Sequence, residues 1–356
     1  MQSRTDITIK WQGLEDSFDR LQRSKYGHAY VVLDSSLVEN DRVTSMLERC
    51  GCQIGILVDH EPTTGQVNTA CDTIRTTASF TSVVGIGGGS AMDLAKAIAV
   101  TAANGGRAEK LQGWDLPTVE SLPTLVVPTI PGTGAEISRT AVLKGPERKL
   151  GINSDFTIPD DCIVDASLFT SVRKEHGVPT LMDCYIHCVE VVRGRYSDSY
   201  AVWVAEDIIN RFEDILKTPY DAADRKRAEL YAYCSYLGGL GLLGGVVGAC
   251  HGLSYGLSHA LNISHSYANV VAMDVLDDYY GDEVSKVRTY CAINDLDCWA
   301  RVTNDNRVTP DTFNKVMEGS LFMEKLWANA ARTEDEALPR ARETILRMNR
   351  LIEARL

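Results

Sequence analysis

The chain lacks an excess of basic charge, a paired cysteine framework and an apolar N-terminal segment. Its 36 Lys and Arg are outnumbered by 48 Asp and Glu, and the net charge of −12 argues against nucleic-acid or anionic-membrane partners, since both favour a basic surface. The ten cysteines form no CxxC pair, so we expect buried thiols in a reducing compartment. The first twenty residues contain no apolar run typical of a signal peptide, and we expect a cytoplasmic protein.

Charge of either sign is also absent from one long stretch. Between Leu230 and Met273 there is no Asp, Glu, Lys or Arg, although 24% of the chain is charged. Glycines and then Ser, Asn and His interrupt this run, which argues against a membrane span. We therefore expect buried helices of a soluble domain.

Strands alternate with helices in the first half of the chain. Runs rich in Val, Ile and Leu predict strands at 28–34, 53–59, 81–87, 122–129 and 162–168. Helical patterns separate the first strands at 37–51, 66–78 and 90–103, and a hairpin is expected at 140–152. Such alternation is typical of a parallel sheet with both faces covered. From about residue 169 only helical spacing continues, as at 201–216. We predict an α/β nucleotide-binding domain at 1–168 and an all-helical metal and substrate domain at 169–356.

A glycine-rich segment, GIGGGSAMDLAK, follows an apolar strand and begins a helix. Three consecutive glycines allow the backbone to approach an anion closely, and a helix N-terminus offers unpaired N–H groups and a positive dipole end. Ser90 and Asp93 have the spacing of a capping box. The segment is neither GxGxxG nor a Walker A loop, so a turn without a ligand remains an alternative.

Two further features fall at the same edge of the expected sheet. The loop PTIPGTGAE at 128–136 follows another strand, and ligands of open parallel sheets bind outside the carboxyl ends of the strands. Asp34 ends an earlier strand, where a carboxylate can accept hydrogen bonds from a ribose diol. That charge would repel a 2′-phosphate and favours NAD over NADP, with a simple turn aspartate as the alternative.

Candidate metal ligands occur as two pairs. Asp183 and His187 are four residues apart on an expected helix and so share one face, and CHGLSYGLSHALNISH at 250–265 adds His251 and His265. A carboxylate with imidazoles suits Zn²⁺ or Fe²⁺. A single buried His is more often a core residue, but several without a partner would be costly to bury, and a metal removes that cost.

These motifs together resemble the iron-containing (group III) alcohol dehydrogenase family, within the dehydroquinate-synthase-like superfamily. GGGSAMDLAK is similar to the family's phosphate loop, PTIPGTGAE to its second glycine loop, and CIVDASL to its DPxL turn with Ala166 in place of proline. Both histidine spacings also match. The resemblance implies an α/β domain before a helical one, NAD, a divalent metal (Zn²⁺ or Fe²⁺), a small sugar or alcohol substrate and a homodimer.

The resemblance also assigns roles to particular residues. The metal ligands would be Asp183, His187, His251 and His265. The cofactor residues would be Asp34, Gly87, Gly88, Gly89, Ser90, Asp93, Thr129, Thr133, Lys149 and Leu168. One position departs from the pattern, because Tyr255 stands where many members place a His near the substrate, and His259 follows one turn later. Tyr255 and His259 are the candidate catalytic residues, and a packed interior histidine is the alternative for His259.

The implied reaction is oxidation of a hydroxyl by hydride transfer to NAD, with the metal acting as a Lewis acid. MDCYIHCVE and CHGLSYGLSHAL are most similar to a subgroup that oxidises the C8 hydroxyl of 3-deoxy-manno-octulosonate ahead of amination for lipopolysaccharide. A carboxylate substrate needs a cation, for which Arg139, Arg193 and Arg195 are candidates. Alternatives are a sugar-phosphate cyclase of the dehydroquinate synthase type, a non-catalytic nucleotide or metal sensor, and transfer of electrons onward to oxygen.

Overall fold

The computed structural model describes residues 5–77, 80–303 and 308–356. It divides into two compact units, which are Met1–Val172 with Ala222–Gly239, and Arg173–Asp221 with Leu240–Leu356. The sequence predicted a single boundary at 168/169. In the structure, the first unit ends at Val172 and also includes residues 222–239, which the prediction assigned to the helical domain. The expected helix at 66–78 ends at a residue outside the described ranges.

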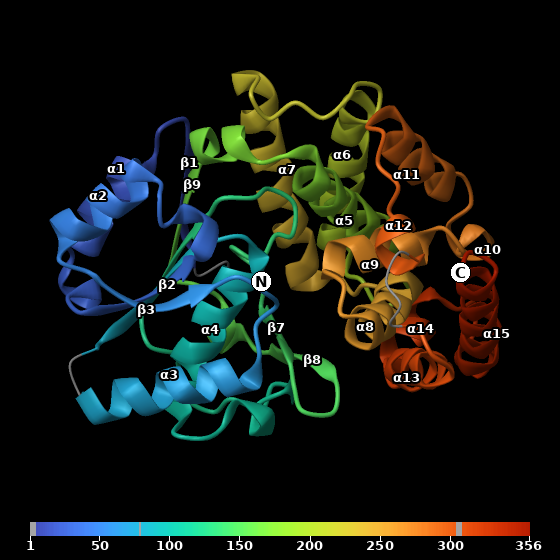
Figure 1. Ribbon diagram of the computed structural model, residues 1–356, viewed down its shortest axis with the longest axis horizontal. Coiled ribbons are helices and arrows are strands. Elements are labelled where there is room, and N and C mark those ends of the chain that lie inside the picture. The colour runs from blue at the N-terminus through green and yellow to red at the C-terminus, as the bar shows by residue number, and fades with distance from the viewer. Residues whose placement is uncertain (1–4, 78–79, 304–307) are drawn as a thin grey trace. The chain divides into compact units, whose positions relative to one another are not determined.

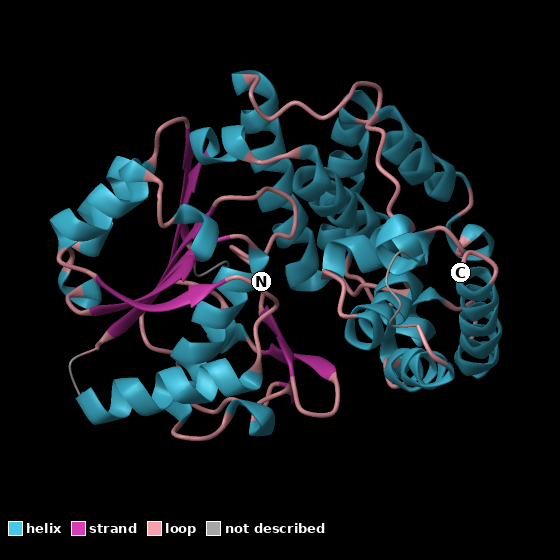
Figure 2. Ribbon diagram, in the orientation of Figure 1, coloured by secondary structure: helices cyan, strands magenta, loops and turns pink. Residues whose placement is uncertain are grey.

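The first unit contains a six-stranded sheet whose neighbouring strands are all parallel (Figure 2). Its order is β1-β9-β6-β4-β2-β3, formed by Asp6–Lys10, Asp161–Asp165, Thr124–Pro128, Ser82–Gly87, Ala29–Asp34 and Gln53–Val58. The predicted parallel sheet is therefore confirmed. The edge strand β1 was not predicted, because its five residues, DITIK, are too few for their alternation of polar and apolar side chains to indicate a strand.

A smaller sheet in the same unit contains the expected hairpin. β7 (Thr140–Lys144) and β8 (Lys149–Asn153) pair antiparallel, and the two-residue β5 (Gly113–Trp114) pairs with β8.

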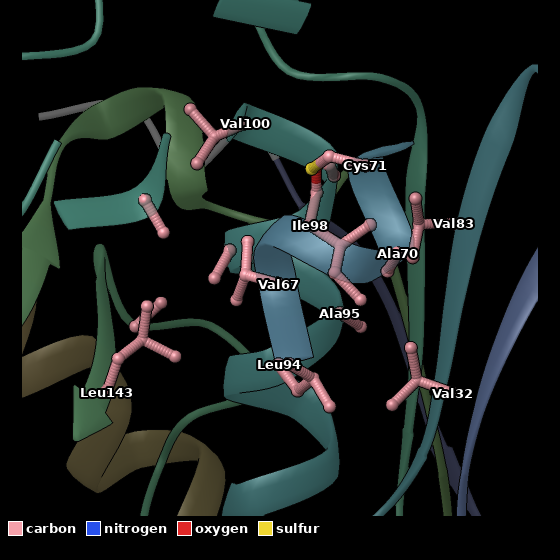
Figure 3. Close-up of a cluster of buried hydrophobic side chains, with 14 of the residues drawn as sticks. Val32, Val67, Ala70, Cys71, Val83, Leu94, Ala95, Ile98, Val100 and Leu143 are labelled. Atoms are coloured by element: carbon pink, nitrogen blue, oxygen red, sulfur yellow. The ribbon is translucent and has the colours of Figure 1, made fainter. Parts of the chain in front are cut away.

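Helices cover both faces of the large sheet, because the buried strands carry apolar side chains on each face. α1 (Leu14–Leu21) and α2 (Asp41–Cys50) pack on one face with Val31, Leu33 and Val84. α3 (Thr64–Thr77) and α4 (Gly89–Asn104) pack on the other, and Figure 3 shows Val67 and Leu94 in that cluster. This packing holds the N-terminus of α4 at the carboxyl end of β4.

The second unit is helical, as predicted (Figure 1). Its helices are α5 (Lys174–Arg193), α6 (Ser199–Ile215), α8 (Ala249–Leu261), α9 (His265–Met273), α10 (Asp277–Tyr280), α11 (Asp282–Ile293), α12 (Ala300–Thr303), α13 (Pro310–Leu321), α14 (Glu324–Ala330) and α15 (Glu334–Glu353). The remaining helix, α7 (Arg225–Gly244), belongs to the first unit up to Gly239.

The charge-free run forms most of α7 and all of α8 and α9. Helix α8 packs closely against its neighbours at two glycines. A Cβ on Gly256 would lie 2.5 Å from the Val316 carbonyl of α13, and one on Gly252 would lie 3.1 Å from the Trp327 ring of α14. Among the described residues no single helix is long and apolar enough to cross a bilayer, and α7 with α8 meets that test only as a pair bent by 106°.

A substitution in the core of the first unit tests this packing. Leu94 is fully buried between α3 and the sheet, and Leu94→Ala should lower the free energy of unfolding by about 2–5 kcal/mol. Leu346→Ala is the matched control, since that side chain is 52% exposed and its loss should change stability by less than about 0.5 kcal/mol. Urea denaturation monitored by circular dichroism measures both, and equal losses would contradict the assigned core.

Candidate functional site

The glycine loop in the first unit connects β4 to α4 and packs tightly on three sides. Gly87 has φ +152°, and a Cβ there would lie 2.7 Å from the Cβ atoms of Asp34 and Ala91. A Cβ on Gly88 would meet Ile130, and one on Gly89 would meet Thr133, both at 3.2 Å. The three glycines are therefore required for the close approach of three chain segments.

This packing brings most of the expected cofactor residues to one edge of the sheet. Asp34 ends β2, and its carboxylate accepts hydrogen bonds from the backbone N–H (3.0 Å) and hydroxyl (2.7 Å) of Ser36. The Thr129 N–H donates to the Gly87 carbonyl over 2.9 Å, which holds the second glycine loop beside the first. The Gly89 and Ser90 N–H groups belong to the first turn of α4, before intrahelical partners are available. The edge therefore offers N–H donors beside a carboxylate.

Three of the expected cofactor residues have other surroundings. No capping box forms between Ser90 and Asp93, because Gly88 caps α4 without a side-chain hydrogen bond and Asp93 instead accepts from the Val142 N–H. Lys149 is buried and forms an ion pair with Glu61 over 2.6 Å. Leu168, in the short helix Ala166–Ser171, packs in the core beside α1 and α2.

Lys96 holds the second glycine loop and was not assigned a role from the sequence. Its buried ammonium donates to the Ala135 carbonyl (3.0 Å), the Ser138 hydroxyl (3.1 Å) and the Thr140 carbonyl (2.5 Å). Burial lowers the pKa of Lys96, and Asp93 at 3.5 Å opposes that shift. The second glycine loop is thus positioned by a buried cation of the first unit.

The second site is a cluster of acidic and imidazole side chains in the second unit. Asp183 extends from α5, His251 from the first turn of α8, and His265 begins α9. Their ligand atoms all lie within 4.8 Å of one another, and Asp183 Oδ1 is 3.4 Å from His251 Nε2. Asp183 and His251 are buried, and His265 is half-buried. The structure therefore brings together three of the four expected metal ligands.

The fourth expected ligand, His187, lies one turn further along α5. A ligand nitrogen of its ring is grouped with the sulfurs of Cys184 and Cys188, again within 4.8 Å. Its Nε2 atom is buried and has no hydrogen-bond partner among the described residues. His187 is therefore close to the cluster in sequence position and unsatisfied, but it is not one of the three converging side chains.

Glu190 orients His251, and no sequence motif assigned it a role. One carboxylate oxygen accepts from the Cys250 N–H (2.7 Å) and the Tyr280 hydroxyl (2.8 Å), at the N-terminus of α8. The other lies 2.5 Å from His251 Nδ1. With Nδ1 bound to Glu190, the Nε2 atom faces Asp183 and can act as a ligand. The signal that could have found Glu190 is its spacing, three residues after His187 and on the same side of α5.

Asn269 lies among the converging ligand atoms. Its side-chain nitrogen is 2.7 Å from Asp183 Oδ1, 3.3 Å from His251 Nε2 and 3.2 Å from His265 Nε2. An amide has only two protons for these three acceptors, and its own oxygen is buried without a hydrogen-bond partner among the described residues. Three electron-pair donors that surround one positively polarised group form an environment suited to a cation.

The electrostatics of the cluster agree with this description. Burial opposes ionisation of Asp183, but the hydrogen bond to His251 and the neighbouring imidazoles outweigh it and lower the pKa of the carboxyl. Burial also disfavours the charged form of His251, and Glu190 and Asp183 outweigh it and raise the pKa to about 9. The two buried carboxylates thus make positive charge favourable at this cluster.

The two candidate catalytic residues lie on α8 beyond His251. The Tyr255 ring centroid is 5.4 Å from that of His265, so the Tyr255 side chain is next to the cluster of Asp183, His251 and His265, which we call the metal-type cluster. His259 is half-buried one turn later. Of the candidate cations for a substrate carboxylate, Arg139 is engaged with Asp115 and Asp155, whereas Arg193 and Arg195 are exposed.

Models of two parts of one family match the two parts of this sequence. The model for iron-containing alcohol dehydrogenases matches residues 5–166, and the model for the C-terminal part of the Fe-containing alcohol dehydrogenase family matches residues 177–318. The chain belongs to the iron-containing alcohol dehydrogenase family. Members of this family use NAD and a divalent metal, so the chain is an NAD-linked alcohol oxidoreductase.

Individual relatives agree with the family. The chain is 31% identical over 292 residues to long-chain-alcohol dehydrogenase 1 of Geobacillus thermodenitrificans, which covers 78% of this chain and 72% of that protein. It is 29% identical to the NAD-dependent methanol dehydrogenase of Bacillus methanolicus, with 71% and 68% covered. The fold is similar to that of sulfoacetaldehyde reductase from Bifidobacterium kashiwanohense in complex with NAD⁺, with a TM-score of 0.78, 18% identity and 97% and 98% covered.

Replacement of the first loop glycine tests the nucleotide edge. Gly87→Ala adds a Cβ against Asp34 and Ala91 at a φ that L-residues avoid, and should cost about 1–3 kcal/mol of stability and weaken NAD binding about tenfold or more. Thermal unfolding and NADH fluorescence titration measure the two effects. Gly106→Ala is the control, since nothing lies within 4 Å of its added Cβ. Unchanged NADH affinity in Gly87→Ala would contradict a cofactor role for this loop.

Removal of the carboxylate behind His251 tests the metal-type cluster. Glu190→Gln keeps the shape of the side chain but cannot accept from His251 Nδ1 and the α8 N-terminus with the same charge, so metal affinity should fall about 10–100-fold. Competition with a chromophoric chelator measures that affinity. The exposed Glu206→Gln on α6 serves as the control. If both variants bind metal equally, Glu190 does not orient a ligand.

Proposed function

We propose that this chain oxidises a hydroxyl of a sugar-type alcohol by hydride transfer to NAD, with a divalent metal held by Asp183, His187, His251 and His265. The observation that carries the proposal is the convergence of Asp183, His251 and His265 around the Asn269 amide. The donor set of one carboxylate and imidazoles fits Zn²⁺ or Fe²⁺.

When bound, the metal supplies a Lewis acid that lowers the pKa of the substrate hydroxyl, and NAD accepts the hydride. The chain's own residues prepare that chemistry. Glu190 fixes the tautomer and the ring orientation of His251. Asp183 contributes a buried negative charge whose lowered pKa keeps it ionised.

Water exclusion is the contribution of the uncharged helices. Leu253 and Leu257 on α8 and Ala268 and Met273 on α9 are fully buried around the ligand-bearing turns. A low local dielectric strengthens the electrostatic interactions of the site and protects a hydride step from solvent. We assign the hydroxyl proton to Tyr255, beside His265, and propose His259, four residues later on α8, as the relay.

NAD is the cofactor that the first unit favours. Gly87, Gly88, Gly89 and Ser90, at the start of α4, would hold the pyrophosphate of bound NAD. Asp34 would accept hydrogen bonds from the adenosine ribose, and its charge would disfavour the 2′-phosphate of NADP. Thr129 and Thr133 belong to the loop that packs on these glycines.

Among sugar-type substrates with a free hydroxyl, we propose the sugar acid 3-deoxy-manno-octulosonate, oxidised at its C8 hydroxyl. The sequences MDCYIHCVE and CHGLSYGLSHAL, with Tyr255 in place of a His, support this choice. Because Arg139 is already paired with two aspartates, the exposed Arg193 and Arg195 are the candidates for a substrate carboxylate.

A homodimer and a cytoplasmic location complete the proposal. All ten cysteines are present as thiols without a disulfide, which supports a reducing compartment. Sedimentation velocity of the purified protein tests the dimer, and cell fractionation tests the location.

Loss of the ligand carboxylate is the test of the proposed function. Asp183→Asn should weaken metal binding by at least about 100-fold, equivalent to about 3 kcal/mol, and abolish NADH formation while the fold persists. Metal content by elemental analysis, NADH absorbance with a panel of alcohols that includes octulosonate, and circular dichroism are the measurements. His176→Ala, an exposed histidine on the same helix, is the control.

Three outcomes separate the alternatives. Full activity in Asp183→Asn would refute the metal assignment. Bound metal in the wild-type protein without NADH from any alcohol would favour the cyclase reaction. Substrate oxidation that consumes oxygen without accumulating NADH would assign oxygen as the final acceptor.

A further inference from the structure

Helix α5 carries a second group of potential ligands beside the Asp183 cluster. Cys184, His187 and Cys188 occupy positions i, i+3 and i+4, so their side chains share one face of the helix. Their sulfur and ring nitrogen atoms all lie within 4.8 Å of one another, and all three residues are buried. All three residues belong to one helix, so the spacing of their backbones does not depend on a loop.

His187 links this group to the cluster already described. It lies four residues after Asp183, one helical turn along α5, and immediately before Cys188. The same imidazole is therefore next to both groups of ligands. The buried Nε2 atom has no hydrogen-bond partner among the described residues. Because an unsatisfied buried polar atom costs free energy, the ring is expected to gain a partner from a bound ligand.

The chemistry of the three groups selects the kind of ion. Two thiolates and an imidazole are soft and borderline ligands, which favour Zn²⁺ over Mg²⁺ or Ca²⁺. Two thiolates also neutralise a divalent charge, which is the least costly arrangement for a fully buried ion. Three protein ligands leave one position of a tetrahedral zinc ion open, as occurs in many zinc sites.

We propose that Cys184, His187 and Cys188 form a second metal position, which binds a thiophilic divalent ion such as Zn²⁺ and shares His187 with the Asp183, His251 and His265 site. On binding, each thiol releases its proton to solvent and forms a sulfur–metal bond, and neither metal nor sulfur changes oxidation state. The imidazole contributes its lone pair as a neutral ligand.

The shared ligand makes the two positions compete. An ion in the sulfur position takes His187 from the other site, which is left with Asp183, His251 and His265. Excess zinc should therefore inhibit an enzyme that carries its functional metal, and the inhibition should disappear when the two thiols are removed. This inhibitory consequence rests on the proposed function, whereas binding at the sulfur position does not.

Cadmium is the probe for direct binding, because thiolate-to-cadmium charge transfer gives an ultraviolet absorption band. Titration of the intact protein with Cd²⁺ should give a band that saturates at one equivalent and releases protons into a weakly buffered solution. The Cys184→Ser/Cys188→Ser double variant should lose this band and weaken Cd²⁺ binding about tenfold or more. Single Cys184→Ala and Cys188→Ala variants, which should each lower the band, provide the test if the double variant does not fold.

The chain offers a matched control in Cys291 and Cys298. These thiols are also buried, close enough to hydrogen-bond with each other, and located in the same unit, but His187 and the α5 ligand face are not part of their group. Cys291→Ser/Cys298→Ser should keep the saturating band. A band of wild-type intensity in Cys184→Ser/Cys188→Ser, or its loss only in the control variant, would overturn the proposal.

The Asp183→Asn variant separates this inference from the proposed function. If the proposed function and the second metal position are both correct, Asp183→Asn loses the metal of the Asp183, His251 and His265 site and keeps the cadmium–thiolate band. If the proposed function fails, the wild-type protein shows no NADH formation but still shows the band. If only the second position fails, activity is normal, no band appears and zinc does not inhibit through Cys184 and Cys188.

Discussion

A buried carboxylate, Glu190, is the interaction on which the metal-type site depends. It extends from α5, accepts N–H groups at the start of α8, binds the hydroxyl of Tyr280 at the end of α10, and lies 2.5 Å from His251 Nδ1. A single charge thus joins three helices and determines which nitrogen of His251 faces Asp183. Negative charge at a helix N-terminus is favourable in itself, so capping and ligand orientation reinforce each other.

In the first unit, a buried positive charge, the ammonium of Lys96, positions the second glycine loop. The buried side chain of Lys96 extends from α4 and donates to the Ala135 carbonyl of the second glycine loop and to the Thr140 carbonyl at the start of β7. The second glycine loop lies against the first. Ser235 of α7 accepts the Gly132 N–H and donates to Glu136, which holds the same loop from its other side. Both loops are therefore held by internal polar contacts, and their backbone N–H groups can be presented to a ligand with little reorganisation.

Much of the fold follows from local patterns in the sequence. Apolar runs of strand length, alternating with helical periodicity, predicted the parallel sheet, and the spacing of Asp183 and His187 placed them on one helix. Spacing also selected His251 and His265, which the structure brings near Asp183. Such features were accessible because they depend on residues close in sequence or on one helix face.

Other features depend on contacts that no local pattern contains. Glu190 and Asn269 acquire their surroundings only when α5, α8 and α9 pack together, and Lys149 meets Glu61 across 88 residues of chain. The grouping of His187 with Cys184 and Cys188 depends on side-chain rotamers, which spacing leaves undetermined. The capping box failed for a related reason, because Asp93 found a backbone donor on β7 instead of one in its own helix.

The glycines of α8 limit how this enzyme can change over evolution or in the laboratory. Gly252 and Gly256 face α14 and α13 without room for a methyl group that does not displace a neighbour, and the fully buried Leu253 and Leu257 follow them. Helix α8 is therefore closed to variation over most of its circumference. Tyr255, His259 and Ala260 are the half-buried positions of this helix, and a change of side chain there leaves the packing of Gly252 and Gly256 in place. Divergence along this helix is expected to concentrate at those positions, and a change at Tyr255 or His259 would alter the proposed proton path together with substrate preference.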